Sequence, residues 1–104
     1  MNQGMSLTIV CEQVEVVEQR SELTLVELCR CARTSAELVA ELVEHGLLTP
    51  RAGAGPDWRF EGRSAAIARR AARLVDELGV NAAGAAVAIE LLDRIERLER
   101  TQRG

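Results

Sequence analysis

Two stretches of helical hydrophobic periodicity, joined by a very short turn, constrain the fold of this chain more than any other feature. The first covers residues 24–32, and the apolar positions that share one side of it are Leu25, Leu28, Cys29 and Ala32. The second covers residues 35–45, and Gly46 supplies the left-handed residue at which a helix ends. Two helices joined in this way predict a helix-turn-helix unit.

A capping pattern marks the start of the second helix. The residues Thr34-Ser35-Ala36-Glu37 match a capping box, in which the first and fourth residues satisfy each other's backbone groups. The Thr34 hydroxyl is expected to accept a hydrogen bond from the N–H of Glu37, and the Glu37 carboxylate one from the N–H of Thr34. The pattern therefore predicts Thr34 as the N-cap.

The segment after this unit has the composition of a β wing. Residues 49–62, TPRAGAGPDWRFEG, combine two prolines and several glycines with an extended Trp58-Arg59-Phe60. Alternate residues of a strand point to the same side, so Trp58 and Phe60 are expected to pin the wing to the helices. A role as partner anchors is the alternative.

Two more helices follow the wing. The third is expected to begin at Arg63 and to end at Gly79. The residues expected to face inward along it are Ile67, Ala71, Leu74, Val75 and Leu78. Asn81 is the expected N-cap of the fourth helix.

The fourth helix carries an apolar stripe with the spacing of a coiled-coil seam. Its members, at intervals of three, four and three, are Ala88, Leu91, Ile95 and Leu98. Only two residues of the chain are aromatic, and a small domain buries a modest fraction of its surface. We therefore expect a homodimer, with Leu91, Ile95 and Leu98 as its dimerisation residues.

These elements predict a mainly α fold, a winged helix-turn-helix with about four helices and a short β wing. At 104 residues the chain fits one domain. Residues 1–22 are expected to form an N-terminal extended segment, because residues 7–17 alternate between apolar and polar positions. Residues 23–104 then form the winged helix-turn-helix domain with its C-terminal dimerisation helix.

The second helix presents an acidic stripe where a DNA-reading helix would be basic. Glu37, Glu41 and Glu44 lie four and three residues apart and so share one side. DNA affinity comes largely from Lys and Arg neutralising phosphates, so this stripe would repel a duplex. Residues 1–49 hold eight acids against three arginines, whereas residues 50–104 hold eight acids against ten. The first half therefore suits a basic partner.

Arginines in the second half keep a nucleic-acid interpretation open. Those that could contact phosphates in and after the wing are Arg51, Arg59, Arg69, Arg70 and Arg73. Arg73 has Glu77 four residues later, so part of this charge is expected to be neutralised within the helix.

The residues that usually support catalysis are scarce. The chain has one His, no Tyr, no Lys and no Gly-rich phosphate loop, so we expect neither an enzyme nor a cofactor. Cys29 and Cys31 lie about 200° apart around a helix, which argues against a shared metal ion. Cys29 is expected in the core and Cys31 as a more exposed thiol, which a redox sensor could use.

Two features of the sequence predict a cytoplasmic protein. The first ten residues lack the basic start and long apolar run of a secretory signal. The longest apolar stretch, residues 82–89, is far shorter than the ~20 residues needed to cross a bilayer.

Over residues 23–98 the chain resembles the MerR-type winged-helix group and, within it, the CbpM chaperone-modulator family. The segments that carry this resemblance are E-x-x-x-x-G-L-L-x-P at 41–50, Trp58-Arg59-Phe60, RAARL at 70–74 with Glu77-Leu78, and Gly84 leading into AVAI at 86–89 and LLDRI at 91–95. The segment before Leu23 and the tail after Leu98 depart from the family pattern.

The resemblance implies an adaptor without catalytic activity. Such an adaptor would bind the J-domain of a CbpA-type, DnaJ-like co-chaperone and keep it from stimulating its DnaK-type chaperone. Our own inference adds the docking residues: Glu37, Glu41 and Glu44, with Glu27 as a possible addition. A small MerR-like DNA-binding transcriptional regulator is the second hypothesis, and a thiol sensor that uses Cys31 is the third.

Overall fold

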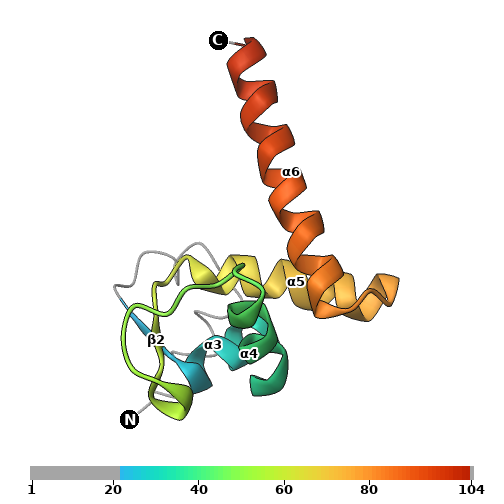
Figure 1. The fold of residues 1–104 in the computed structure, drawn as a ribbon. Helices are drawn as coiled ribbons and strands as arrows, with labels where there is room; N and C mark the ends of the chain where they lie inside the picture. Colours follow the sequence, from blue (N-terminus) through green and yellow to red (C-terminus); the bar gives the residue numbers. More distant parts are fainter. Residues whose placement is uncertain (1–21, 104) are drawn as a thin grey trace.

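A computed structural model describes residues 22–103 of the chain (Figure 1). In chain order its elements are β1 (Leu23–Thr24), α3 (Leu25–Ala32), α4 (Ala36–Glu44), a 3-10 turn (Gly55–Asp57), β2 (Arg59–Phe60), α5 (Ser64–Leu78) and α6 (Ala82–Arg103). These four helices and the small sheet within the described range confirm the predicted mainly α, winged helix-turn-helix fold. The extended segment predicted at residues 7–17 lies outside the described residues.

A capping box is present, but at the start of α3. The Thr24 Oγ1 accepts from the N–H of Glu27 at 3.1 Å, and the Glu27 Oε1 accepts from the N–H of Thr24 at 2.9 Å. Both hydrogen bonds satisfy backbone groups that a helix start leaves unpaired. They also tie α3 directly to β1, because Thr24 is both the last residue of β1 and the N-cap of α3.

The capping box predicted at Thr34 and Glu37 is wrong. α3 ends in a left-handed residue, Arg33 with φ 58°, and the N–H of Thr34 donates to the carbonyl of Cys29 at 3.1 Å. Thr34 is therefore part of the turn that closes α3. Ser35 caps α4 instead, with its Oγ accepting from the N–H of Leu38 at 3.1 Å.

The end of α4 follows the prediction. Gly46 has a φ of 81°, the left-handed conformation that favours glycine. The N–H groups of Leu47 and Leu48 both donate to the carbonyl of Leu42, at 2.9 and 3.3 Å. The chain is thereby turned toward the wing, and Leu48 is 2% exposed in the core.

The wing is held to the helix-turn-helix by β2, which pairs antiparallel with β1. Leu23 lies opposite Phe60, and Thr24 opposite Arg59. On its other side Arg59 bridges Ala52, with its N–H 2.9 Å from the Ala52 carbonyl. The wing predicted over residues 49–62 is confirmed. Its strand β2 pairs with β1, which lies directly before α3.

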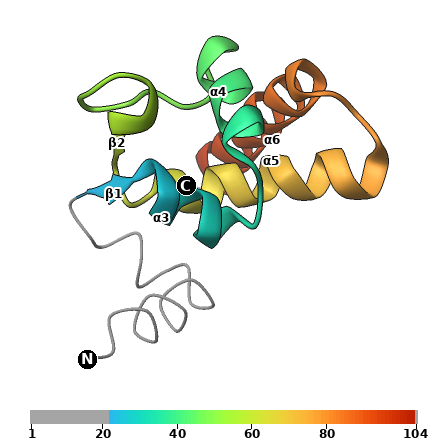
Figure 2. The same cartoon turned by 90° about the horizontal axis from the view of Figure 1, so that it is seen from below.

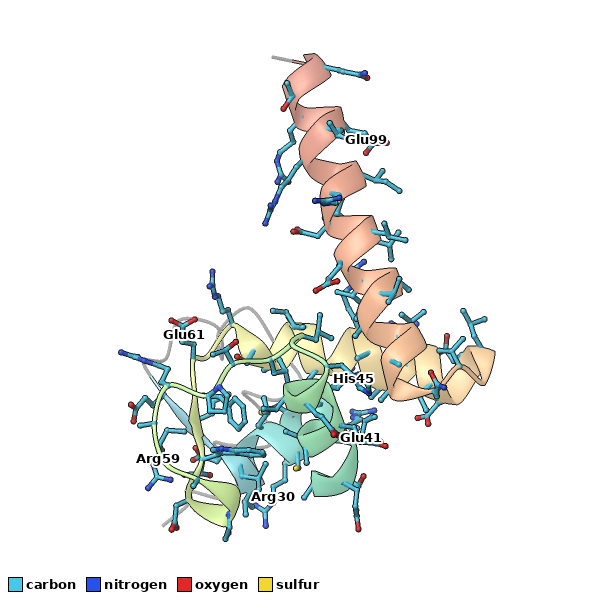
Figure 3. All side chains as sticks on the ribbon, in the orientation of Figure 1. Arg30, Glu41, His45, Arg59, Glu61 and Glu99 are labelled. Carbon is cyan, nitrogen blue, oxygen red and sulfur yellow. The ribbon has the colours of Figure 1, made fainter. Side chains whose placement is uncertain are left out.

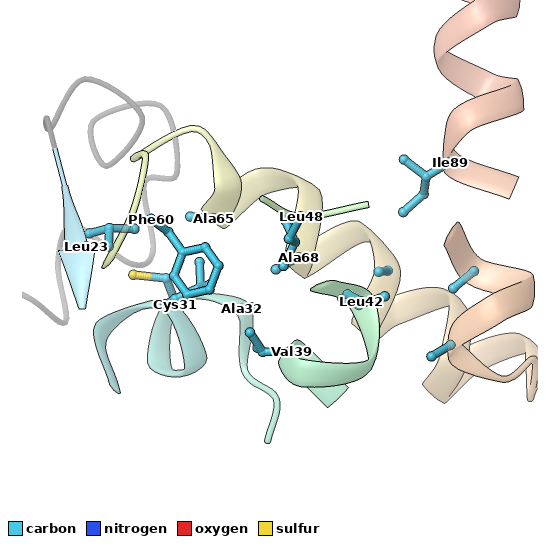
Figure 4. Packing of buried hydrophobic residues seen from close by; sticks show 14 residues of the cluster. Leu23, Cys31, Ala32, Val39, Leu42, Leu48, Phe60, Ala65, Ala68 and Ile89 are labelled. Atoms are coloured by element: carbon cyan, nitrogen blue, oxygen red, sulfur yellow. The ribbon is translucent and has the colours of Figure 1, made fainter. Parts of the chain in front are cut away.

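A core of small and aliphatic side chains lies between α3, α4 and α5 (Figure 4). The largest fully buried side chains are Phe60, Leu23, Leu28, Leu42, Val39 and Cys31. On α5, Ala65, Ala68 and Ala71 are 0% exposed. Alanines at these positions let the α5 backbone approach its neighbours closely, so a core with few aromatics still packs without large side chains.

The assignment of the two helical cysteines was wrong. Cys31 is 1% exposed, whereas Cys29 is half-buried. The buried side of α3 is made by Leu28, Cys31 and Ala32, because α5 and β2 both pack against this helix. Hydrophobic periodicity alone placed Cys29 on the buried side of α3, where the structure has Cys31.

Leu78, which was expected to face inward, is 69% exposed. The last turn of α5 extends beyond α3 and α4 in the view from below (Figure 2), so these two helices do not cover it there. The end of the helix itself matches the prediction, since Gly79 has a left-handed φ of 70°. The helix begins at Ser64, one residue later than expected.

The last helix, α6, belongs to the core only through its first turns. The Asn81 Oδ1 accepts from the N–H of Gly84 at 2.8 Å, which confirms the predicted cap. Ala82, Ala85 and Ile89 join the core cluster beside α4 and α5. Beyond them the helix extends away from the rest of the molecule (Figure 1). No helix within residues 22–103 is long and apolar enough to cross a membrane.

Candidate functional site

The outer face of α4 is acidic, as the spacing of its glutamates predicted. Glu37, Glu41 and Glu44 are all exposed, and Glu41 is labelled on α4 in Figure 3, whereas Val39 and Leu42 on the other side are 0% exposed. Because Ser35 caps the helix, Glu37 is not tied into the capping box that the sequence suggested. The three carboxylates therefore form one solvated stripe, and α4 itself contains no basic residue. We call this set the acidic stripe.

Glu27 does not belong to the acidic stripe. It lies on α3, it is half-buried, and its carboxylate accepts the hydrogen bond from the Thr24 N–H. This carboxylate holds the junction between β1 and α3. The structure thus gives Glu27 a local structural role and separates it from the exposed glutamates of α4.

The arginines considered as phosphate contacts are divided between the wing and α5. On the wing, the Arg59 Nη1 donates to the carbonyls of Asp57 at 3.3 Å and Trp58 at 3.4 Å. On α5, the Arg73 Nε lies 3.4 Å from the Glu77 Oε2, which confirms the expected pairing. Arg51 and Arg70 are exposed and Arg69 is half-buried. Part of this positive charge is therefore engaged within the chain.

The two aromatic residues pack together, as the alternation along the wing predicted. Their ring centroids lie 5.8 Å apart at an interplanar angle of 72°, an edge-to-face arrangement. Phe60 is 0% exposed and Trp58 is half-buried against the core. Phe60 thus pins the wing and offers no surface to a partner, while Trp58 retains an accessible part.

The C-terminal half of α6 carries an exposed apolar stripe. Leu91 is 53% exposed, Ile95 50% and Leu98 63%, and none of the described elements covers them. Along the same half, the Arg97 Nη2 lies 2.8 Å from the Asp93 Oδ2 in the expected i,i+4 pair. The structure therefore brings the predicted dimerisation residues onto one solvent-facing side. We call Leu91, Ile95 and Leu98 the apolar seam.

The structure removes the basis for a thiol sensor at Cys31. That side chain is 1% exposed, and burial raises the pKa of the Cys29 thiol above its usual value. A thiol with a raised pKa holds less of the reactive thiolate at neutral pH. Within residues 22–103, no group of three or more His, Cys, Asp or Glu side chains is arranged to hold a metal ion.

Sequence reasoning missed one surface feature, a groove between the end of α3 and α5. Its charged lining is Arg33 from the turn after α3, with Arg69, Arg73, Asp76 and Glu77 from α5. The residues from the two elements lie far apart in sequence, so no local pattern connected them. The exposure of Arg33 and its positive φ depend on how α3 ends, which the incorrect Thr34 cap concealed.

Comparison with known proteins identifies the relatives of this chain. Residues 23–103 match the family described as MerR HTH family regulatory protein. A Chaperone modulatory protein CbpM of Coxiella burnetii (strain Dugway 5J108-111) is 34% identical over 88 residues, which cover 85% of this chain and 83% of the relative. The same-named protein of Pseudomonas putida (strain GB-1) is 38% identical over 77 residues, or 74% of this chain and 76% of the relative. The chain belongs to the CbpM family.

Membership of the CbpM family confirms the resemblance found in the sequence. The match to the MerR HTH family runs from β1 through α6, so it includes the helix-turn-helix, the wing and the helix that carries the apolar seam. The scaffold is therefore one associated with regulatory proteins. In this chain its second helix presents carboxylates outward, and that property distinguishes the candidate site from a DNA-reading helix.

Proposed function

We propose that this chain is a chaperone modulator that binds the J-domain of a CbpA-type, DnaJ-like co-chaperone and inhibits its stimulation of a DnaK-type chaperone. The names of its relatives support a role in chaperone modulation. The single observation that carries the proposed docking mode is the acidic stripe, in which all charges on the exposed side of α4 are negative.

The negative charge of the acidic stripe favours a basic protein over a nucleic acid as the partner. A helix placed in the groove of a duplex lies beside phosphates, and its affinity depends on neutralising them with Lys and Arg. Three exposed carboxylates on that helix oppose such binding. The family resemblance supplies a partner of the opposite charge, since J-domains present a basic helix to their chaperone. Charge complementarity of this kind speeds association and discriminates among partners.

The proposed mechanism is occlusion. The J-domain helix that docks against α4 would be the one that otherwise meets the DnaK-type chaperone, so one surface cannot serve both partners at once. Stimulation of ATP hydrolysis falls as the J-domain becomes occupied. Because this mechanism needs no bond making or breaking, it requires neither a catalytic residue nor a cofactor.

The active form is proposed to be a homodimer formed through the apolar seam. A solvent-exposed row of Leu, Ile and Leu on the C-terminal half of α6, which no described element covers, is costly in water. The intervals of three, four and three among Ala88, Leu91, Ile95 and Leu98 suit knobs-into-holes packing against a second copy. Pairing there leaves the acidic stripe on a different helix and free for the co-chaperone.

The decisive experiment measures J-domain binding and chaperone ATP hydrolysis with the purified protein. Replacing Glu37, Glu41 and Glu44 together by Arg should weaken J-domain binding about a hundredfold and restore ATPase stimulation, as several interfacial charge pairs become repulsive. The matched control replaces three exposed glutamates of α6, Glu90, Glu96 and Glu99, by Arg. An equal loss of J-domain affinity in both variants would mean that the effect comes from net charge. No loss of affinity in either variant would mean that the co-chaperone docks on a different surface.

A small MerR-like DNA-binding transcriptional regulator is the second candidate, because the matched family is described as regulatory. Among its candidate phosphate contacts, Arg51 and Arg70 are exposed. A mobility-shift titration separates the two functions, since binding through phosphates weakens steeply as salt rises. The absence of a shift at low salt, together with binding of a J-domain, would dismiss the regulator.

A further inference from the structure

Large aliphatic side chains of α6 are exposed on both flanks of the apolar seam. In heptad notation, the positions a and d that face a partner helix are held in order by Ala88, Leu91, Ile95 and Leu98. Val87 then falls at the flanking position g and Leu92 at the flanking position e, and they are 55% and 39% exposed. Isoleucine at a with leucine at d favours two strands in a parallel coiled coil. The seam therefore has the composition of a parallel pair.

The other elements of the molecule leave this side of α6 open to a second helix. The buried residues of α6, which face those elements, are Ala82, Ala85, Ala86 and Ile89. At ~100° per residue, their mean direction lies about 150° from that of the apolar seam. The two sides are therefore nearly opposite, and beyond Ile89 the helix extends away from the other elements (Figure 1). A second α6 fits along the seam without displacing the helices that hold the first.

Two charged side chains on the flanks of the seam are not engaged within the chain. Arg94 occupies the next g position and Glu99 the next e position. Both are exposed, and Figure 3 shows Glu99 on the part of α6 that extends away. Among the described residues, neither makes a hydrogen bond or an ion pair, in contrast to the paired Arg97 and Asp93. Arg94 and Glu99 are therefore available to a second helix.

These flanking residues distinguish the two directions that a second helix could take. In a parallel, in-register pair, each g residue faces the e residue of the following heptad in the other copy. Arg94 then faces Glu99, and Val87 faces Leu92, so both flanks are complementary. In an antiparallel pair that aligns the two seams, g positions face each other, and Arg94 lies against Arg94 of the other copy. Like charges placed together are unfavourable, so charge complementarity favours the parallel direction.

We propose that two copies of α6 pair in parallel and in register, with Arg94 of each chain against Glu99 of the other. Val87 of each chain packs on Leu92 of the other, beside the small Ala88. The two-fold symmetry of such a pair makes each contact twice. This inference rests on the homodimer of the proposed function and adds its direction and its flanking contacts. Both copies of α4 lie at the same end of the coiled coil, because α4 packs against the first turns of α6.

A charge exchange in the full chain tests the ion pair, with the dimer dissociation constant measured by sedimentation equilibrium. Arg94→Glu and Glu99→Arg should each weaken the dimer about tenfold, because each replaces two attractive pairs by two repulsive ones. The double variant should return the dissociation constant to within about threefold of the unmodified chain, since it restores both pairs with reversed signs. The matched control, Glu96→Arg with Arg100→Glu, exchanges charges at the outward positions b and f. Its single and double variants should stay within about twofold.

Cysteine cross-linking tests the direction of the second helix. Leu98→Cys places one thiol at a d position, where the two copies meet in the parallel pair, whereas an antiparallel pair sets Leu98 opposite Ala88. A disulfide needs Cα atoms within about 7 Å, so mild oxidation should join the two introduced thiols, as peptide mass spectrometry identifies. The matched control Arg100→Cys, at an outward position, should give no such disulfide.

The outcomes separate this proposal from the proposed function. A dimer that the double exchange fails to restore, or that forms no disulfide between the two Leu98→Cys positions, would overturn the parallel direction and leave the homodimer in place. An unmodified chain that stays monomeric would overturn both the homodimer and its direction. J-domain binding is measured separately, because the acidic stripe lies on a different helix and each chain keeps it.

Discussion

The body of the molecule and the C-terminal half of α6 carry similar apolar periodicities but use them differently. In the body, Leu28, Val39 and Leu42 are 0% exposed because α3, α4 and α5 cover one another. In α6, Leu91, Ile95 and Leu98 are at least half exposed, since no described element reaches them. A helical hydrophobic stripe thus indicates that a face will be covered, but not whether the same chain covers it.

The largest effect should come from removing an aromatic side chain from the body. Phe60→Ala should lower the free energy of unfolding by ~3–5 kcal/mol, because it leaves a cavity under the wing. Leu98→Ala removes a side chain that is 63% exposed, and in dilute solution it should change stability by less than ~0.5 kcal/mol. Urea unfolding measures both. Similar losses would erase the distinction between the two regions.

A charge in the apolar seam should break self-association and leave the body folded. Ile95→Glu should weaken the proposed homodimer about a hundredfold, which corresponds to ~2.7 kcal/mol, because a carboxylate would be buried against a second copy. Sedimentation equilibrium measures the dissociation constant, and far-ultraviolet circular dichroism reports the helices. A wild-type chain that is monomeric at high concentration would show that this stripe is not the interface.

Within the body, two glycines with the same positive φ separate backbone strain from steric contact. Gly53 and Gly46 both have a φ of 81°. A Cβ at Gly53 would clash with the Asp57 carbonyl oxygen, whereas one at Gly46 would meet nothing within 4 Å. Gly53→Ala should therefore cost ~2–3 kcal/mol and Gly46→Ala ~1 kcal/mol. Thermal unfolding tests the order, and equal costs would mean that the wing shifts to accommodate the methyl group.

The smallest effects should come from the caps of the two helices in the helix-turn-helix. Thr24→Ala and Ser35→Ala should each lower stability by ~1 kcal/mol, because each hydroxyl accepts from a backbone N–H at a helix start. Thr34→Ala should lower stability by less than ~0.5 kcal/mol. The hydrogen bond that closes α3 comes from the backbone N–H of Thr34, and the substitution keeps this group. A larger loss for Thr34→Ala than for Ser35→Ala would restore the cap predicted from the sequence.

Most of the fold could be predicted because its signals are local. The ends of α4 and α5 depend on Gly46 and Gly79, whose left-handed conformations each act within one turn. The acidic stripe follows from residue spacing on one helix, so its exposure was also predictable. Errors arose where two elements meet. The buried side of α3 is determined by α5 and β2, and periodicity therefore exchanged the roles of Cys29 and Cys31.

The groove could not be predicted, because its two sides come from different parts of the chain. Arg33 contributes from the turn after α3, and Arg69 and Arg73 from the middle of α5. No sequence pattern in either stretch indicates that the two will lie side by side. The pairing of β1 with β2 is of the same kind, since residues 23–24 and 59–60 meet only when the wing folds back. Such contacts depend on packing between elements, which propensity and periodicity do not encode.

The sequence by itself determined the helical segments, the wing, the acidic side of α4 and the apolar seam of α6, since each depends on residues within a few positions of one another. Only the tertiary structure decided which faces become core and which stay in water. It buried Cys31, exposed Leu78 and brought Arg33 beside α5. The physical reason is that burial and electrostatic environment depend on which surfaces pack against each other, and that choice is made by the whole chain.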